Sequence, residues 1–424
     1  MVQLTDDCFA FDGPLMTVED ALDRVRARLR PVTAIETVGL DAALGRVLAE
    51  TVVSAMNVPP HDNAAVDGWA VYVDDLAVDD ETRLPVAGRA AAGVPLGTAQ
   101  PRGQAVRIFT GAPMPAGPVG EPGPDTVLMQ EDCRLEGEVV IIPAGIKRGA
   151  NRRFAGEDVI AGATILTPGC RLRAQEIGLA ASIGRTRLRV RAPLRVAVFS
   201  TGDEVREPGS VLVAGTIYDS NRHTLKALLH GLGCTVTDLG ILGDEPARIR
   251  AALTAAAGDH DVLITSGGVS TGEEDHVRAA VEVEGRLDAW RLAIKPGRPV
   301  ALGVVRGAAF LGLPGNPVAV VVTFLALARP VLLGLMGADI IPPTRFPVTA
   351  SFDFKKKTGR REYVRVSLDV DASGQLIACK AGRDGAGVLS SLVAADGLLE
   401  LHEDATGLAK GETAAYLPFS EVMR

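Results

Sequence analysis

The spacing of hydrophobic residues changes several times along the chain, and each change indicates a different kind of structure. In residues 17–30 apolar side chains recur at helical spacing, and Thr17 and Asp20 form a capping pair, which predicts an amphipathic helix. Residues 51–149 hold short Val-rich runs between turn residues about every 8–12 positions, a pattern typical of a small all-β domain. Around residues 174–183 the spacing becomes helical again. Helical and β segments therefore alternate on the scale of domains.

Residues 193–335 alternate between apolar runs of strand length and helical segments. This alternation predicts an α/β domain with a mostly parallel sheet and helices on both faces. The remaining residues return to the two-residue periodicity of a β domain, which we expect to be barrel-like. We therefore predict a multidomain protein of the α/β plus β class, with domains at 1–50 together with 150–192 (helical, discontinuous), 51–149 (small β), 193–335 (α/β) and 336–424 (C-terminal β).

The longest apolar stretch covers residues 317–338 and is interrupted by Arg329 and Pro330. A membrane-spanning helix needs about 20 continuous apolar residues. We therefore expect a buried core helix at this position and no membrane partner.

Composition narrows the range of functions. The chain has 424 residues, a net charge of −8, and only 4% aromatic residues. Both of the latter values argue against a nucleic-acid-binding surface. The five cysteines are far apart and form no CxxC motif, which disfavours a disulfide framework or a zinc site. We expect a reducing compartment, the cytoplasm.

Three predicted strands of the α/β domain end in glycine-bearing loops, at 200–204, 265–275 and 313–317, and the second of these is also rich in hydroxyl residues. Ligands of such sheets bind beyond the carboxyl ends of the strands, and glycine lets backbone N–H groups approach an anion closely. The alternative is a set of tight turns without a ligand, which is less favoured because three loops share one rim. The predicted ligand-binding residues of these loops are Thr201, Gly202, Ser266, Gly267, Gly268, Ser270, Pro314, Gly315 and Asn316.

Charged residues accompany these loops. Glu204, Asp244 and Asp275 are predicted ligands of Mg²⁺, which prefers hard oxygen donors beside a phosphate. Other nearby acids, such as Glu245 and Glu273, are better explained by the helix dipole. The basic loop at 294–299 offers Lys295 and Arg298 for an anion, although two solvated cations in a turn are the alternative. The segment 355–365 is a local basic patch that we expect either to attract an anionic substrate or to be a solvated hairpin.

Further short motifs accompany these loops along the chain. The full set is, in order, Asp62-Asn63, Asp67-Gly68, Thr110-Gly111, residues 156–158, 200–204, 215–221, 265–270, Asp275, 295–297 and 313–317. Together these motifs, in this order, resemble those of the molybdopterin molybdenumtransferase family (MoeA, with the gephyrin E domain as its animal relative). The resemblance implies an α/β domain of the molybdopterin-binding type within a four-domain homodimer.

The resemblance also implies a reaction. A member of this family inserts molybdate into adenylated molybdopterin with Mg²⁺ and releases AMP and molybdenum cofactor. Its site would lie between subunits, with the α/β domain of one facing the C-terminal domain of the other. Further partners would be molybdopterin adenylyltransferase and molybdoenzymes. The residues given a catalytic role on this basis are Asp62, Thr110, Asp158, Glu204, Asp275 and Lys295.

The chain departs from the family pattern at a few positions. Arg291 stands where many members have Lys, Ala64 and Val66 replace the usual Ser and Met, and Ala386 replaces a Ser between two glycines. Two alternative functions therefore stay open. The first is another enzyme on the same superfold, a molybdopterin adenylyltransferase or a nucleotide pyrophosphatase, and the second is a non-catalytic cofactor carrier or scaffold.

Overall fold

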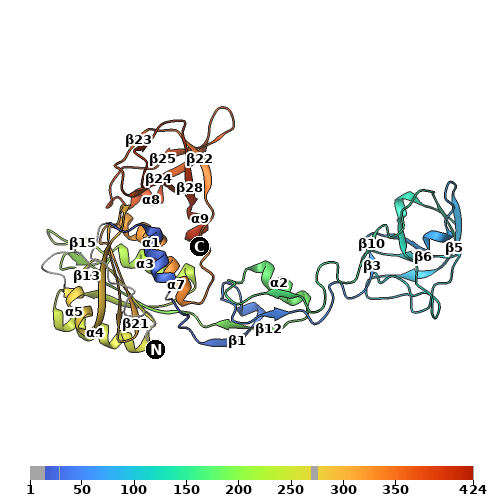
Figure 1. The fold of residues 1–424 in the computed structure, drawn as a ribbon, viewed down its shortest axis with the longest axis horizontal. Helices are drawn as coiled ribbons and strands as arrows, with labels where there is room; N and C mark the ends of the chain where they lie inside the picture. Colours follow the sequence, from blue (N-terminus) through green and yellow to red (C-terminus); the bar gives the residue numbers. More distant parts are fainter. Residues whose placement is uncertain (1–14, 28, 269–275, 424) are drawn as a thin grey trace. The chain divides into compact units, whose positions relative to one another are not determined.

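The computed structural model describes residues 15–27, 29–268 and 276–423, and these form two compact units (Figure 1). The larger unit comprises Met1–Ala49, Pro168–Arg173 and Leu188–Arg424, and the smaller unit comprises Glu50–Thr167 and Ala174–Arg187. The predicted domain boundaries divide the chain more finely than these units do.

A six-stranded sheet forms the centre of the larger unit, in the order β16-β13-β17-β21-β20-β18. The first four strands are parallel, whereas β20 is antiparallel to both of its neighbours. The inner strands are nearly continuous apolar runs because helices cover both of their faces. The strand bounds are β13 (Arg195–Thr201), β16 (Thr235–Leu242), β17 (Val262–Ser266), β18 (Gly285–Arg291), β20 (Pro299–Val305) and β21 (Ala308–Leu313).

Alternate residues of β13 divide between two hydrophobic cores. Val196 and Val198 pack with one set of helices, and Ala197 and Phe199 pack with another. Figure 1 shows the second set, α4 and α5, on one side of the sheet and α1, α3 and α7 on the other. The helix bounds are α1 (Val18–Arg26), α3 (Asn221–Leu232), α4 (Pro246–Asp259), α5 (His276–Glu284), α6 (Pro317–Thr323) and α7 (Arg329–Leu335).

Two local predictions about helices are confirmed. The Thr17 hydroxyl accepts a hydrogen bond from the Asp20 N–H at 3.1 Å and caps α1. Helices α6 and α7 are joined by a π-helical segment, Phe324–Ala328, into one run from Pro317 to Leu335. That run is long and apolar enough to cross a membrane, yet 78% of its apolar window is buried inside the protein. It is therefore a core helix.

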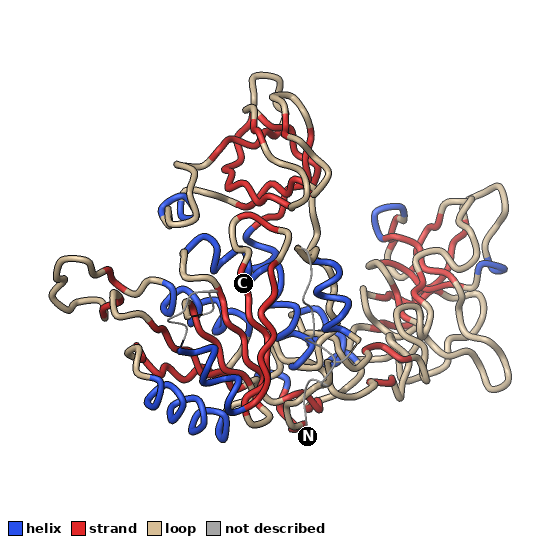
Figure 2. The backbone as a smooth tube through the Cα atoms, turned by 60° about the vertical axis from the view of Figure 1, so that its left-hand side comes forward, coloured by secondary structure: helices blue, strands red, loops and turns tan. Residues whose placement is uncertain are grey.

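The C-terminal residues form a second six-stranded sheet, in the order β19-β24-β25-β22-β28-β26, which an additional β24–β26 pairing closes into a barrel (Figure 2). Strand β19 (Ile294–Lys295) comes from the α/β part of the unit and pairs in parallel with β24, so that Lys295 lies opposite Glu362. This pairing joins the barrel to the α/β sheet. The other strands are β22 (Phe346–Ala350), β24 (Arg361–Val370), β25 (Leu376–Lys380), β26 (Gly397–Leu401) and β28 (Thr413–Pro418).

The smaller unit is built on a sheet in the order β7-β4-β6-β5-β9-β8, together with α2 (Ala174–Ser182). Its short strands confirm the all-β pattern predicted for this part of the chain. Their bounds are β4 (Gly68–Val71), β5 (Thr82–Ala90), β6 (Ala105–Ile108), β7 (Thr126–Met129), β8 (Arg134–Glu136) and β9 (Val139–Ile142). Short paired strands in the two units are β3 (Asn63–Ala64) with β10 (Arg152–Arg153), β2 (Val52–Val53) with β11 (Thr164–Leu166), and β14 (Val205–Arg206) with β15 (Ile217–Tyr218).

Candidate functional site

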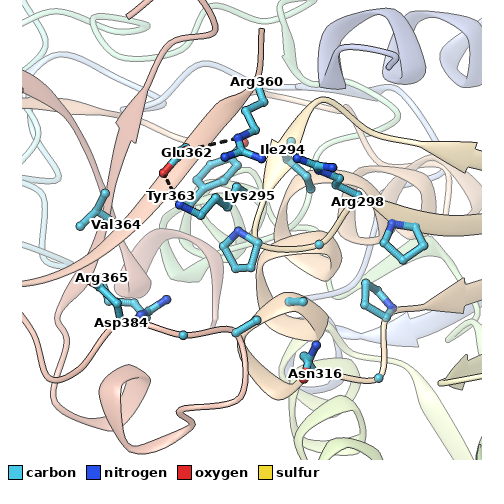
Figure 3. Close-up of a pocket in the computed structure, with 18 of the residues that line it drawn as sticks. Ile294, Lys295, Arg298, Asn316, Arg360, Glu362, Tyr363, Val364, Arg365 and Asp384 are labelled. Atoms are coloured by element: carbon cyan, nitrogen blue, oxygen red, sulfur yellow. Dashed lines mark hydrogen bonds and ion pairs between the residues drawn. The ribbon is translucent and has the colours of Figure 1, made fainter. Parts of the chain in front are cut away.

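A pocket of about 710 Å³ opens in the larger unit between the rim of the α/β sheet and the barrel (Figure 3). Two of the three predicted glycine loops line it, and so does the basic loop before β20. Both sides of the pocket come from one chain. Of the predicted residues it contains Gly267, Gly268, Lys295, Arg298, Pro314, Gly315 and Asn316.

The third loop, which holds Thr201 and Gly202, does not line the pocket, but Thr201 packs against Gly268, which does. A Cβ built on Gly268 would lie 2.7 Å from the Thr201 Oγ1 atom, so a side chain cannot be accommodated there. Gly268 also has a φ of +64°, which favours glycine. The predicted residues Ser270 and Asp275 lie outside the described residues.

Lys295 is held by a buried acid, Glu362. Its Nζ lies 3.0 Å from Oε2 of Glu362, whose side chain is only 3% exposed, and the Arg360 Nε lies 3.3 Å from the other carboxylate oxygen. Figure 3 shows both contacts as dashed lines. The two cations therefore share one negative charge, and the group keeps a net positive charge at the pocket wall.

The basic segment 355–365 does not act as one uniform patch. Lys355 and Arg360 line the pocket. Lys356 points elsewhere, and its Nζ donates to backbone carbonyls of His402 and Ala405, both at 2.7 Å. Arg361 likewise turns away from the pocket and pairs with Glu19 and Glu403. Only part of the predicted patch therefore faces the pocket.

Arg365 is a buried cation of the pocket wall with one donor that has no partner among the described residues. It is 7% exposed, its Nη2 donates to the Arg383 carbonyl at 3.2 Å, and its Nε has no partner among the described residues. Burial lowers the pKa of this guanidinium, and the nearby Asp384 opposes that effect. An unpaired buried donor is unfavourable unless a ligand accepts from it. The arrangement therefore fits an anionic ligand.

The loop around Ala386 meets the first turn of α6. The Ala386 carbonyl accepts a hydrogen bond from the Val318 N–H at 2.9 Å. The methyl group of Ala386 cannot donate a hydrogen bond, but the backbone still connects the barrel to the helix. The substitution at Ala386 leaves this contact intact.

Two of the three predicted metal ligands, Glu204 and Asp244, lie just after the ends of β13 and β16. The Asp203 N–H donates to the Asp244 carboxylate at 3.2 Å, and the Glu204 carboxylate lies over Gly202, where a Cβ would come within 2.6 Å of it. Neither Glu204 nor Asp244 lines the pocket. Within the described part of the chain, no group of three His, Cys, Asp or Glu side chains is arranged to hold a metal ion.

The predicted catalytic residues of the smaller unit have local partners. Asp62 accepts from the Ala155 N–H at 2.7 Å and pairs with Arg152. Burial opposes its ionisation, but these two contacts outweigh burial and hold its pKa below the ordinary value. Asp158 is exposed, and its backbone N–H donates to the Val58 carbonyl.

Thr110 fixes a loop of the same unit. Its N–H and its hydroxyl both donate to one carboxylate oxygen of Asp67, at 2.8 and 2.7 Å. These bonds lower the pKa of Asp67. Catalytic roles for Asp62, Thr110 and Asp158 stay predictions.

Some residues of the site carried no sequence signal, or a weak one. Glu362, Arg360 and Arg365 were visible only as members of a charged segment, and nothing in their spacing indicated which would turn inward. Asn221 occurs in one of the motifs, but its contacts with two separate loops depend on the tertiary fold.

Comparisons with known proteins cover most of the chain. Three family models match: the MoeA N-terminal region (domain I and II) at residues 16–184, the probable molybdopterin binding domain at 197–334, and the MoeA C-terminal region (domain IV) at 347–419. A molybdopterin molybdenumtransferase of Haemophilus influenzae is 38% identical over 96% of this chain and 100% of its own length. Molybdopterin molybdenumtransferase 2 of Mycobacterium tuberculosis is 36% identical over 92% of this chain and 96% of its own length.

A solved structure gives the same result for the fold. The molybdopterin biosynthesis moeA protein of Pyrococcus horikoshii matches with a TM-score of 0.80 and 27% identity, over 96% of this chain and 100% of that one. The predicted fold class is thereby confirmed. On sequence and on fold, this chain belongs to the molybdopterin molybdenumtransferase (MoeA) family of enzymes.

Proposed function

We propose that this chain inserts molybdate into adenylated molybdopterin, releases AMP and forms molybdenum cofactor. The observation that carries the proposal is the pocket wall of Lys295, Arg298, Arg360 and Arg365, of which Arg365 has a buried Nε without a partner among the described residues. Phosphate and molybdate are both oxyanions, and guanidinium groups bind oxyanions through paired hydrogen bonds. Cleavage of a phosphoanhydride places negative charge on phosphate oxygens, which fixed cations stabilise.

We also propose that the reaction depends on Mg²⁺. Magnesium usually takes one or two protein carboxylates and completes its shell with water and substrate phosphates, so a three-residue cluster is not required. Glu204 and Asp244 would hold it, with Asp275, which lies outside the described residues. When bound, the ion would neutralise phosphate charge.

Three further parts of the proposal concern the setting of the enzyme. We expect a homodimer, a cytoplasmic location, and transient contact with molybdopterin adenylyltransferase and molybdoenzymes. The cysteines are far apart in the sequence and form no CxxC motif, a pattern that favours a reducing compartment. The mass of the purified protein in solution tests the dimer.

Turnover tests the reaction. The purified chain is incubated with adenylated molybdopterin and molybdate, with Mg²⁺ or with a chelator, and AMP is measured together with reconstitution of an apo-molybdoenzyme. We expect AMP and active cofactor to form together, and both to fall when Mg²⁺ is removed. Transfer of AMP from ATP onto molybdopterin would instead indicate an adenylyltransferase. Tight binding of the adenylated pterin without release of AMP would indicate a carrier.

A further inference from the structure

Asn221, the first residue of α3, connects two loops of the pocket. Its side-chain amide nitrogen Nδ2 donates to the Ser266 hydroxyl at 2.8 Å and to the Gly315 carbonyl at 2.6 Å. Ser266 ends β17 and directly precedes Gly267 and Gly268, while Gly315 follows β21. One side chain therefore links loops that lie almost fifty residues apart in the sequence.

The orientation of this amide is set by its acceptors. A carbonyl oxygen accepts hydrogen bonds only, so the NH₂ end of Asn221 must face Gly315. The two hydrogens of that NH₂ group match the two acceptors. The Oδ1 atom is buried and has no hydrogen-bond partner among the described residues. The side chain is thus held by its donor end, and aspartate, which has the same shape, would place an oxygen against the Gly315 carbonyl.

The strands before these two loops are paired as far as Ser266 and Leu313, so Asn221 acts on the residues beyond the end of this pairing. The Gly267 N–H donates to the Leu313 carbonyl at 3.0 Å, and a Cβ built on Gly315 would stand 3.9 Å from the Gly267 Cα. The two glycines, Gly267 and Gly315, have no side chains, and their backbones are conformationally free. A binding loop made of glycine needs an external support to keep one geometry.

Asn221 itself stands on a rigid base. The next residue, Arg222, is only 2% exposed and pairs with Asp219, Glu207 and Asp238. These contacts hold the start of α3 in place. A side chain anchored in this way can hold the two loops that it contacts at a fixed separation.

We propose that Asn221 is a positioning residue, which holds the two glycine loops at the spacing that the anionic ligand of the pocket requires. It touches no reacting atom and acts through Ser266 and Gly315. The identity of the ligand rests on the function proposed above, whereas the link between the loops does not.

The experiment compares Asn221→Asp and Asn221→Ala with Thr224→Val. Thr224 lies in the same turn of α3, and its hydroxyl donates to the Ser220 carbonyl of the preceding turn, at 2.9 Å, so its replacement is a matched control. Amide hydrogen exchange is measured in peptides that cover residues 262–268 and 313–316. Thermal unfolding and steady-state kinetics with adenylated molybdopterin are measured on the same proteins.

In both Asn221 variants we expect exchange in the two loops to be faster by about 10-fold, the equivalent of one lost hydrogen bond. We also expect KM for adenylated molybdopterin to rise about 10-fold or more, with a smaller change in kcat. Aspartate should raise KM more than alanine, because it repels both the carbonyl and the anion. Thr224→Val should resemble the wild type in exchange and in KM.

Three results would contradict the proposal. The first is wild-type exchange in the loops of both Asn221 variants, and the second is faster exchange with an unchanged KM. The third is a lower kcat at constant KM that follows the loss of thermal stability, as expected of a purely structural residue. A wild-type chain that does not turn over adenylated molybdopterin would contradict the proposed function instead, and the exchange measurement would then decide the role of Asn221 by itself.

Discussion

At the scale of single residues, Gly297 shows how the basic loop is kept against α6. Its φ is +105°, and a Cβ at this position would stand 2.4 Å from the Thr323 Oγ1 atom and 3.1 Å from the Ala319 carbonyl oxygen. We predict that Gly297→Ala lowers the free energy of unfolding by about 2–4 kcal/mol through backbone strain and overpacking. Urea denaturation of the purified variant measures this loss.

Gly307 provides the matched control for Gly297. Its φ is +96°, but no atom lies within 4 Å of the position that a Cβ would occupy. Gly307→Ala should therefore lower the free energy of unfolding only by the cost of the left-handed backbone, about 1–2 kcal/mol. If the two variants lost equal amounts of unfolding free energy, overpacking against α6 would not contribute to the effect at Gly297.

Asp238 makes the stability of the unit depend on pH. Burial disfavours its charge, but Lys226, the Gly240 N–H and Arg222 hold its pKa at about 2, below the ordinary 3.8. The unfolded chain therefore binds a proton first as the pH falls, so this contribution to stability is complete above about pH 4 and is lost towards about pH 2.

We predict that Asp238→Asn destabilises the protein by about 1–2 kcal/mol at pH 7, a moderate value because the side chain is partly exposed and Arg222 keeps two other partners. The difference between the variant and the wild type should shrink as the pH falls from about 4 to about 2. Unfolding free energies of both proteins, measured across this pH range, test the direction of this change. A difference that stays constant down to pH 2 would assign the effect to packing.

At the scale of elements, the parts that could be predicted are those with a local signal. The apolar runs of β13, β17 and β21 predict buried strands, and glycine after each run marks the rim where ligands bind. Strand β19 has only two residues, and its pairing with β24 joins positions 67 residues apart. The periodicity of the sequence around these residues does not indicate such a long-range pairing. For that reason Lys295 was predicted as an anion-binding residue while its partner Glu362 was not.

The position of Lys295 in the pocket wall leads to a prediction about substrate binding. In Lys295→Met the pocket wall loses a compact positive charge, so KM for the anionic substrate should rise about 10-fold at low salt, and the difference should narrow as salt screens the charge. Kinetics at several ionic strengths measure both effects. Lys357→Met is the control, because Lys357 is exposed and does not line the pocket. A salt-independent change in KM would point to lost structure.

At the scale of the whole molecule, the sequence pattern led to the right fold class but left the composition of the site uncertain. Domain-scale changes in periodicity are long enough to be seen in one sequence, and motifs in family order restrict the fold further. Which domain faces which depends on surfaces that form only after folding. The resemblance placed the α/β domain of one subunit opposite the C-terminal domain of another. In the structure both parts line one pocket within a single chain.

This arrangement leads to a prediction for mixed subunits. Lys295→Ala and Arg365→Ala each remove a cation from the same pocket, one from the α/β side and one from the barrel. Once the mass of the protein confirms a dimer, the two variants are unfolded, mixed in equal amounts and refolded together, and turnover is compared with that of each variant alone.

If one chain supplies both cations, every chain in the mixture has a defective pocket, so activity should not exceed that of the separate variants. A site shared across a two-fold axis would give mixed dimers with one intact pocket, and activity would recover to about a quarter of the wild-type value. We expect no recovery, because Lys295 is paired at 3.0 Å with Glu362 of its own chain, three residues before Arg365 on the same strand.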